Sequence, residues 1–281
     1  MKKRLPGIIF LLSLTLLVVC SHNSCSTSAF FYHPEKTIRH YPDSTRCMYE
    51  NAYFKTADSS RLHGWLIRSL KDVEPLATVL LFHGNAGNVG YQFQSLMPLA
   101  EAGFQCFVFD YREFGKSEGK VSQEHVLEDG LAALRYLRGR PDVAGQKIIL
   151  FGQSLGGHLA VVVAAQKQSE LAALVTEGAF SGHEQIAEWA GKKQYRAPKF
   201  LTRWFVPSKY DAIEVVEQIG IPKLFIHSTE DQEVPFFMSK ELYEKAKEPK
   251  ELWEIKGPHI RCYQLYTEEF VQRFRDILKE K

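Results

Sequence analysis

The chain has 281 residues, of which 45% are hydrophobic and 24% are charged, and its formal net charge is +2. These values are ordinary for a globular protein, and the balanced charge, without a basic stripe, argues against nucleic acid as a partner. The sequence shows no internal repeat or low-complexity tract. The roughly 250 residues after the N-terminal segment match the usual size of one α/β domain.

Residues 1–25 form a separate N-terminal segment. A basic start, Met1 to Arg4, precedes an apolar run from Ile8 to Val19 that is short for a membrane span. The layout resembles a bacterial lipoprotein signal in which Cys20 is lipidated, although Val19 stands where such signals usually carry Gly, Ala or Ser. Soluble secretion and an uncleaved anchor are the alternatives. We therefore expect a protein of the bacterial cell envelope that is membrane-associated through its N-terminus, periplasmic or secreted.

Strand and helix patterns alternate after a leader over residues 26–44. We expect strands over 47–56, 62–68, 78–82, 105–109, 148–151, 171–176, 223–227 and 252–255, and helices over 92–102, 123–138, 159–165, 235–247 and 263–278. Short apolar strands that alternate with helices predict an α/β fold over 45–281, with a mostly parallel sheet covered by helices on both faces. Aromatic and basic residues over 177–210 interrupt this rhythm and indicate an insertion over the carboxyl edge of the sheet.

Five cysteines are present, and two of them, Cys20 and Cys25, lie at or near the expected processing site. Cys106 lies inside an apolar run and is interpreted as a small buried hydrophobe. Cys47 and Cys262 could pair in an oxidising compartment, but the sequence does not place them within bridging distance. No Cys or His spacing resembles a zinc site, and we expect neither a metal nor an organic cofactor.

The stretch from Lys147 to His158 carries the strongest chemical signal. It predicts a buried strand, a sharp Gly-x-Ser-x-Gly turn centred on Ser154, and the start of a helix. Small residues flank such a turn because the serine backbone is strained and the helix packs close to the strand. The turn exposes a hydroxyl beside helix-terminal amide groups that can bind developing negative charge. The plainer interpretation is that Ser154 only caps the helix.

Partners for this serine follow later in the chain. A serine hydroxyl needs a base to act as a nucleophile, and the base needs an orienting carboxylate. Asp231 follows the expected strand 223–227 and His259 follows the last expected strand, so both belong at the carboxyl edge of the sheet. Glu230 and Glu233 are neighbouring acids that could be mistaken for Asp231. The alternative is that all of these are solvated loop residues.

Four motifs together resemble the α/β-hydrolase superfamily over nearly all of residues 45–280. They are the loop from His83 to Asn88, Asp110-Tyr111-Arg112 with its loop to Gly119, the turn from Gly152 to Gly157, and Asp231 with Val234-Pro235 followed by His259. The combination is similar to compact, often membrane-anchored serine hydrolases, which include depalmitoylase-like and lysophospholipase-like proteins. The motifs are specific for the superfamily and weak for the substrate.

The resemblance implies a role for each matching residue. Ser154 attacks a carbonyl carbon, His259 takes the serine proton, and Asp231 orients His259. The backbone N–H groups of Asn85 and Leu155 form the oxyanion hole.

The sequence departs from the family pattern at three positions. Glu113 stands where glycine is frequent, so that loop is expected to bend differently. Ser228 replaces a common glycine, and Pro258 restricts the backbone before the base.

These features favour a serine hydrolase that cleaves a carboxylic ester or thioester of a small or lipid-like acyl substrate through an acyl-enzyme. The aromatic stretch from Trp189 to Phe205 is a candidate acyl pocket, or it packs on the sheet edge. An amide-bond hydrolase is the alternative, in which Glu177, Glu184 or Glu188 would hold a substrate amine. A non-catalytic binding protein on the same fold is the third hypothesis. The sequence does not indicate the oligomeric state.

Overall fold

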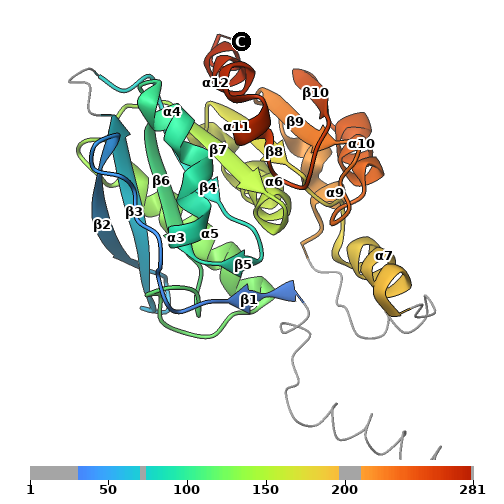
Figure 1. Ribbon diagram of the computed structural model, residues 1–281, viewed down its shortest axis with the longest axis horizontal. Helices are drawn as coiled ribbons and strands as arrows, with labels where there is room; N and C mark the ends of the chain where they lie inside the picture. Colours follow the sequence, from blue (N-terminus) through green and yellow to red (C-terminus); the bar gives the residue numbers. More distant parts are fainter. Residues whose placement is uncertain (1–30, 70–73, 196–209, 280–281) are drawn as a thin grey trace, which may run out of the picture.

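The computed structural model describes residues 31–69, 74–195 and 210–279 (Figure 1). The N-terminal segment with Cys20, and the part of the expected insertion that follows Tyr195, lie outside these ranges. Within them, no helix is long and apolar enough to cross a membrane. Lipidation, membrane association and envelope location therefore stay predictions.

An eight-stranded sheet forms the centre of the fold, in the order β10-β9-β8-β7-β4-β6-β3-β2. Its strands are β2 (Cys47–Lys55), β3 (Arg61–Ser69), β4 (Thr78–Phe82), β6 (Gln105–Asp110), β7 (Ile148–Gln153), β8 (Ala173–Glu177), β9 (Lys223–Ser228) and β10 (Lys250–Ile255). The run from β10 to β6 pairs in parallel, whereas β3 and β2 pair antiparallel at one edge. The predicted mostly parallel sheet is confirmed.

Helices cover both faces of this sheet (Figure 1). One face carries α5 (Gln123–Arg138), α6 (Leu155–Lys167), α9 (Ala212–Val215) and α10 (Phe236–Lys245), and the other carries α3 (Val89–Gln92), α4 (Met97–Glu101), α11 (Cys262–Leu265) and α12 (Thr267–Asp276). Alternate strand residues enter the two cores. Leu80 and Leu150 lie in the α5–α6 core, and Val79 and Ile149 lie in the α4–α12 core. Burial on both faces explains why the strands are continuously apolar.

The prediction of a single helix over 92–102 is wrong. The chain instead forms α3, a 3₁₀ turn η1 (Phe93–Leu96), and α4. The first piece begins early because the Asn88 side chain accepts a hydrogen bond from the Gly90 N–H and caps it. Pro98 lacks an N–H and stands at the start of α4, which favours a break in the α-helix there.

Two other expected regions also differ in detail. The helix expected over 263–278 is divided at Tyr266 into α11 and α12. The region without strand–helix rhythm contains a further helix, α7 (His183–Tyr195), which projects from the sheet (Figure 1). Its buried residues, His183, Ala187 and Gly191, are four positions apart but small or polar, so the buried face of the helix produces no strong apolar period.

The leader lies across the loop that follows β4. Its short strand is β1 (His33–Pro34), and the parallel partner is β5 (Ala86–Gly87). The His33 N–H donates to the carbonyl oxygen of Asn85 at 2.7 Å, and the Asn88 side-chain amide donates to the Glu35 carbonyl oxygen at 2.9 Å. These two bonds hold the loop against the leader. The described part of the leader therefore packs on the domain, with residues 33–37 against this loop.

The three described cysteines outside the N-terminal segment are free and buried. Cys106 is fully buried among apolar residues, as expected for a small hydrophobe. Cys47 and Cys262 do not form the disulfide that was possible from the sequence. Cys47 packs instead against Met97, with its Sγ 3.8 Å from the thioether sulfur. The α/β domain is thus held together by its two cores, without a covalent link between described cysteines.

Gly156→Ala is expected to prevent folding or to lower the free energy of unfolding by more than about 4 kcal/mol. An added methyl group would overlap the backbone carbonyl oxygens of Phe82 and His83, which cannot move without disturbing β4. Denaturant unfolding followed by circular dichroism measures the effect. Gly220→Ala is the control, because its methyl group meets only Gln168 Oε1, at 3.5 Å. Equal effects of the two substitutions would contradict a close approach of α6 to β4.

Candidate active site

Ser154 lies at the junction of β7 and α6, in a strained backbone conformation with φ 55° and ψ −120°. Such a conformation costs about 1–3 kcal/mol and persists only where the surroundings impose it. Here the Ser154 N–H donates to the carbonyl oxygen of Glu177 at 2.9 Å, which fixes the turn to β8. The Ser154 side chain makes no hydrogen bond that caps α6. The interpretation of Ser154 as a mere capping residue is therefore not supported.

The loop expected to form the oxyanion hole lies against this serine. A Cβ atom added to Gly84 would be 3.7 Å from Ser154 Cβ. The Asn85 N–H has no hydrogen-bond acceptor in the described part of the chain, and Leu155 is the first residue of α6, where amides lack partners within the helix. His83 is fully buried, and its Nδ1 lies 2.7 Å from the Gly84 carbonyl oxygen. This burial fits a residue that organises the loop.

Asp231 and His259 come together from the loops after β9 and β10. His259 Nδ1 lies 2.5 Å from Asp231 Oδ2, while Oδ1 of the same carboxylate accepts the backbone N–H groups of Glu233 and Val234 at 2.8 and 3.0 Å. Burial by itself raises the pKa of Asp231, but the hydrogen bonds from histidine and backbone donors outweigh it and hold the pKa below its usual range. Because this carboxylate is ionised, Nδ1 of His259 carries the proton and Nε2 is left as a base.

The candidate nucleophile, Ser154, and the candidate base, His259, are not joined to each other. Within the described ranges, no hydrogen bond runs from Ser154 Oγ to His259. Gly178 leaves room for the base, because a Cβ atom there would lie 2.7 Å from His259 Cε1. The structure thus contains the contact between Asp231 and His259 that the predicted triad requires, but not a hydrogen bond between Ser154 and His259.

His227 is a second histidine on the same carboxylate, and the sequence did not reveal it. Its Nε2 lies 3.3 Å from Asp231 Oδ2 and 2.9 Å from the Val234 carbonyl oxygen. Both neighbours only accept hydrogen bonds, so this nitrogen carries a proton. His227 therefore stabilises ionised Asp231 and the loop that presents it. The available signal was its place at the end of a strand, four residues before Asp231.

Glu177 links the turn at Ser154 to the segment that follows His259. Its buried carboxylate accepts from Gln153 Nε2 at 2.7 Å and from the Cys262 N–H at 2.8 Å. Burial raises the pKa of this carboxyl group. The Ser228 hydroxyl makes a similar link, because it donates to the Gly257 carbonyl oxygen at 2.5 Å. The serine that replaces glycine at position 228 thus ties the acid loop to the base loop.

Asp110 supports the loop from His83 to Asn88 from the neighbouring strand. Its carboxylate accepts the Val89 N–H at 2.8 Å, at the start of α3, and contacts His63 Nδ1 at 3.0 Å. After it, Glu113 adopts φ 70°, the left-handed conformation that favours glycine. The different bend expected of this loop stays a prediction. The Glu113 carboxylate is held by Lys120 and the Val121 N–H.

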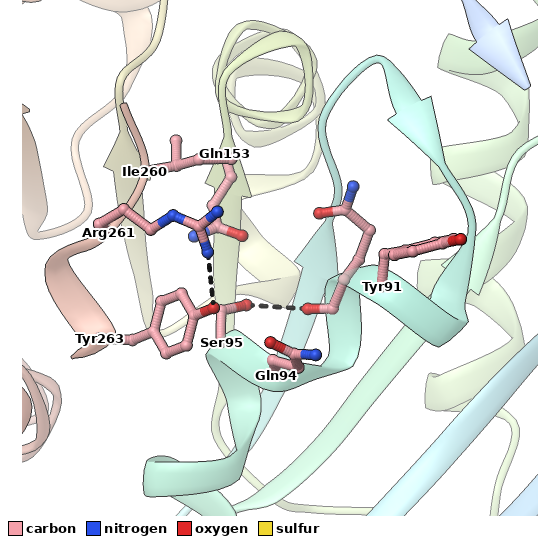
Figure 2. A pocket seen from close by; sticks show the side chains of 8 residues that line it. Tyr91, Gln94, Ser95, Gln153, Ile260, Arg261 and Tyr263 are labelled. Atoms are coloured by element: carbon pink, nitrogen blue, oxygen red, sulfur yellow. Dashed lines mark hydrogen bonds between the residues drawn. The ribbon is translucent and has the colours of Figure 1, made fainter. Parts of the chain in front are cut away.

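A cavity of about 230 Å³ adjoins these catalytic candidates. Figure 2 shows Arg261 and Tyr263 on one side, facing Gln94 and Ser95 on the other. Gln153, directly before the candidate nucleophile, also lines it, and Arg261 Nη1 lies 3.3 Å from the Tyr263 hydroxyl oxygen. The walls are therefore mostly polar and include one guanidinium group. The aromatic acyl pocket suggested for 189–205 lies largely outside the described residues.

Known proteins resemble both the sequence and the fold. Residues 77–207 match the family model described as alpha/beta hydrolase fold. The chain is 33% identical to the uncharacterized protein YfhR of Escherichia coli O157:H7, over 99% of this chain and 93% of that protein. It is 31% identical to the alpha/beta hydrolase domain-containing protein WAV2 of Arabidopsis thaliana, over 73% and 69%. The Pyrococcus furiosus esterase Pf2001 superposes with a TM-score of 0.72 at 24% identity, over 88% and 98%. The chain therefore belongs to the alpha/beta hydrolase family.

Proposed function

We propose that the protein is a serine hydrolase that cleaves a carboxylic ester or thioester through an acyl-enzyme intermediate. The observation that carries the proposal is the 2.5 Å contact between His259 Nδ1 and Asp231, which leaves a basic Nε2 at the edge of the sheet that also presents Ser154. Family membership supports hydrolase chemistry, and the fold is shared with the esterase Pf2001. Ser154 is partly exposed, and the adjacent Gly84 has no side chain that could cover it.

The proposed reaction has two halves. Ser154 Oγ attacks the carbonyl carbon while its proton moves to His259 Nε2, and the N–H groups of Asn85 and Leu155 bind the oxyanion. The bond to the leaving group then breaks, and His259 gives the proton to the departing alkoxide or thiolate. Water repeats the sequence: it attacks the acyl carbon, its proton passes to His259, and Ser154 recovers that proton when the acid is released. Asp231 stays ionised throughout and stabilises the histidine cation.

An amide-bond hydrolase is less well supported. That alternative uses an acidic residue to hold a substrate amine, and Glu177 was one candidate. Both of its oxygens are occupied, by Gln153 and by the Cys262 N–H, and its side chain is buried. The cavity beside the site instead offers the Arg261 guanidinium, which attracts anionic and polar groups and repels an ammonium group. We assign this cavity to a polar arm of the ester.

A substrate panel tests the proposal. Full-length protein is incubated with p-nitrophenyl esters of graded acyl length, an acyl thioester and an aminoacyl p-nitroanilide. We expect ester and thioester hydrolysis with an initial burst of the leaving group, because acylation precedes deacylation, and little anilide hydrolysis. Faster cleavage of the anilide would favour the amide-bond alternative. A folded protein that cleaves none of these compounds would favour a binding protein.

A further inference from the structure

His158, His183 and Asp211 form a buried cluster apart from the candidate active site. One ring nitrogen of each histidine and one carboxylate oxygen all lie within 4.8 Å of one another. The three side chains come from α6, the start of α7 and the residue before α9. His183 Nδ1 lies 2.8 Å from Asp211 Oδ1, and His158 Nε2 lies 4.0 Å from the same oxygen. A tetrahedral zinc ion spaces its ligand atoms by about 3.3 Å, which falls inside this range.

The hydrogen bonds of His158 cannot all be satisfied by a neutral ring. Its Nδ1 lies 3.1 Å from the Phe180 carbonyl oxygen, and its Nε2 lies 3.1 Å from the Tyr210 carbonyl oxygen. Both oxygens only accept, whereas a neutral imidazole has a single N–H. His158 is fully buried, so in the neutral ring the second nitrogen has no proton to donate and is shielded from solvent. The lone pair of one ring nitrogen therefore faces the lone pairs of a carbonyl oxygen, of Phe180 or of Tyr210. A cation bound by both atoms would remove this repulsion.

His183 adds a second unsatisfied group at the same place. Its side chain is 2% exposed, and its Nε2 has no hydrogen-bond partner among the described residues. Aromatic rings pack against both histidines. The Phe180 ring stacks on His158 with centroids 4.3 Å apart, and Phe31 meets the His183 ring edge-on at 5.4 Å. Buried polar atoms without partners are uncommon in apolar surroundings and call for an occupant.

We propose that His158, His183 and Asp211 bind one divalent transition-metal ion, with zinc the best match. Two imidazoles and a carboxylate suit zinc, and the Tyr210 carbonyl oxygen faces the same space as a fourth donor. With the ion on Nε2, His158 donates its Nδ1–H to Phe180, the arrangement that usually orients a metal-binding histidine. Magnesium and calcium prefer all-oxygen ligands and do not match this set.

The location indicates what the ion does. Residues 180–183 leave the sheet after β8, and residues 210–211 return to it before β9, so the cluster joins both ends of the intervening segment to α6. α6 begins at the candidate nucleophile. A bound ion would fasten residues 180–183 and 210–211 to α6 and stabilise the folded state by mass action. The site is structural, since its donors are not part of the proposed reaction.

Metal analysis of the full-length protein tests the proposal. Protein treated with a chelator is titrated with zinc chloride, separated from free metal by gel filtration, and analysed by mass spectrometry for zinc. We expect one retained equivalent and a higher Tm. Cobalt(II) in place of zinc is expected to give the visible absorption of a tetrahedral site. Loss of a partner outside the ligand shell already costs about 10- to 100-fold in affinity, so removing a ligand is expected to cost at least about 100-fold.

Two variants make the result specific. His183→Gln keeps a side-chain donor toward Asp211 and should fold, yet it should lose the retained zinc and the rise in Tm. His125→Ala is the matched control, because His125 lies on α5, outside the cluster, and bonds the Lys120 carbonyl oxygen. It should retain one equivalent. No stoichiometric zinc in the unaltered protein, or equal zinc in folded His183→Gln, would overturn the proposal, whatever the hydrolase assays show.

Discussion

Replacing Ser154 with alanine is expected to lower kcat for ester hydrolysis by about 10⁴- to 10⁶-fold, because the variant has no atom to form the acyl-enzyme. Covalent labelling by a fluorophosphonate probe should disappear as well, since such probes react with activated serines. The backbone of the turn is held by the bond from the residue 154 N–H to the Glu177 carbonyl oxygen, which alanine retains. The variant should therefore fold, and the loss should be chemical.

A matched control for this experiment is Ser122→Ala. Ser122 caps α5 through a hydrogen bond to the His125 N–H at 3.2 Å and lies outside the candidate site. We expect it to lose only about 1 kcal/mol of stability and to keep full labelling. Labelling that persists in Ser154→Ala would assign the nucleophile to another residue. A folded unaltered protein without labelling would refute an activated serine.

Asp231→Asn is expected to lower kcat by about 10⁴-fold while the protein stays folded. The asparagine oxygen can still accept the Glu233 and Val234 N–H groups that hold the loop. Its NH₂ group then faces His259 Nδ1, which must accept a hydrogen bond instead of donating one. The proton of the neutral imidazole moves to Nε2, and that nitrogen can no longer accept a proton from Ser154.

Steady-state kinetics and circular dichroism measure this result. Glu233→Gln is the control, because the Glu233 side chain is exposed and only its backbone N–H bonds Asp231. Its kcat should stay within about twofold of the unaltered protein, as is usual for surface changes. Similar losses in both variants would indicate a general effect of charge on the loop and would contradict the assignment of Asp231 as the orienting acid.

Local patterns were sufficient to predict most of the fold. Continuous apolar runs marked the buried strands, and the glycines around Ser154 predicted a tight strand–helix turn that the structure contains. These features depend on neighbours within a few residues, which is the range over which sequence periodicity is informative. The prediction of one continuous helix in the region 89–101 was wrong because it used only this local periodicity. Its helical pattern is clear, but the cap at Asn88 and the break at Pro98 divide it.

The arrangement of the candidate site could be predicted only in part. The chain order of Ser154, Asp231 and His259 indicated that they share one edge of the sheet, because parallel strands end there together. The contacts that support these three residues could not be predicted from any pattern in the sequence. His227 approaches Asp231, and Glu177 bonds both Gln153 and the Cys262 N–H, through side-chain directions that loop paths determine.

By itself, the sequence determined the fold class, the strained serine turn and the identity of the three catalytic candidates. Only the tertiary structure decided which distant segments meet: the leader strand on the loop from His83 to Asn88, and the cluster of His158, His183 and Asp211. The spacing of those three residues resembles no metal motif, since 24 and 27 positions separate His158 from His183 and His183 from Asp211. The physical reason is that contacts between distant segments depend on how the chain crosses the sheet, which no local period encodes.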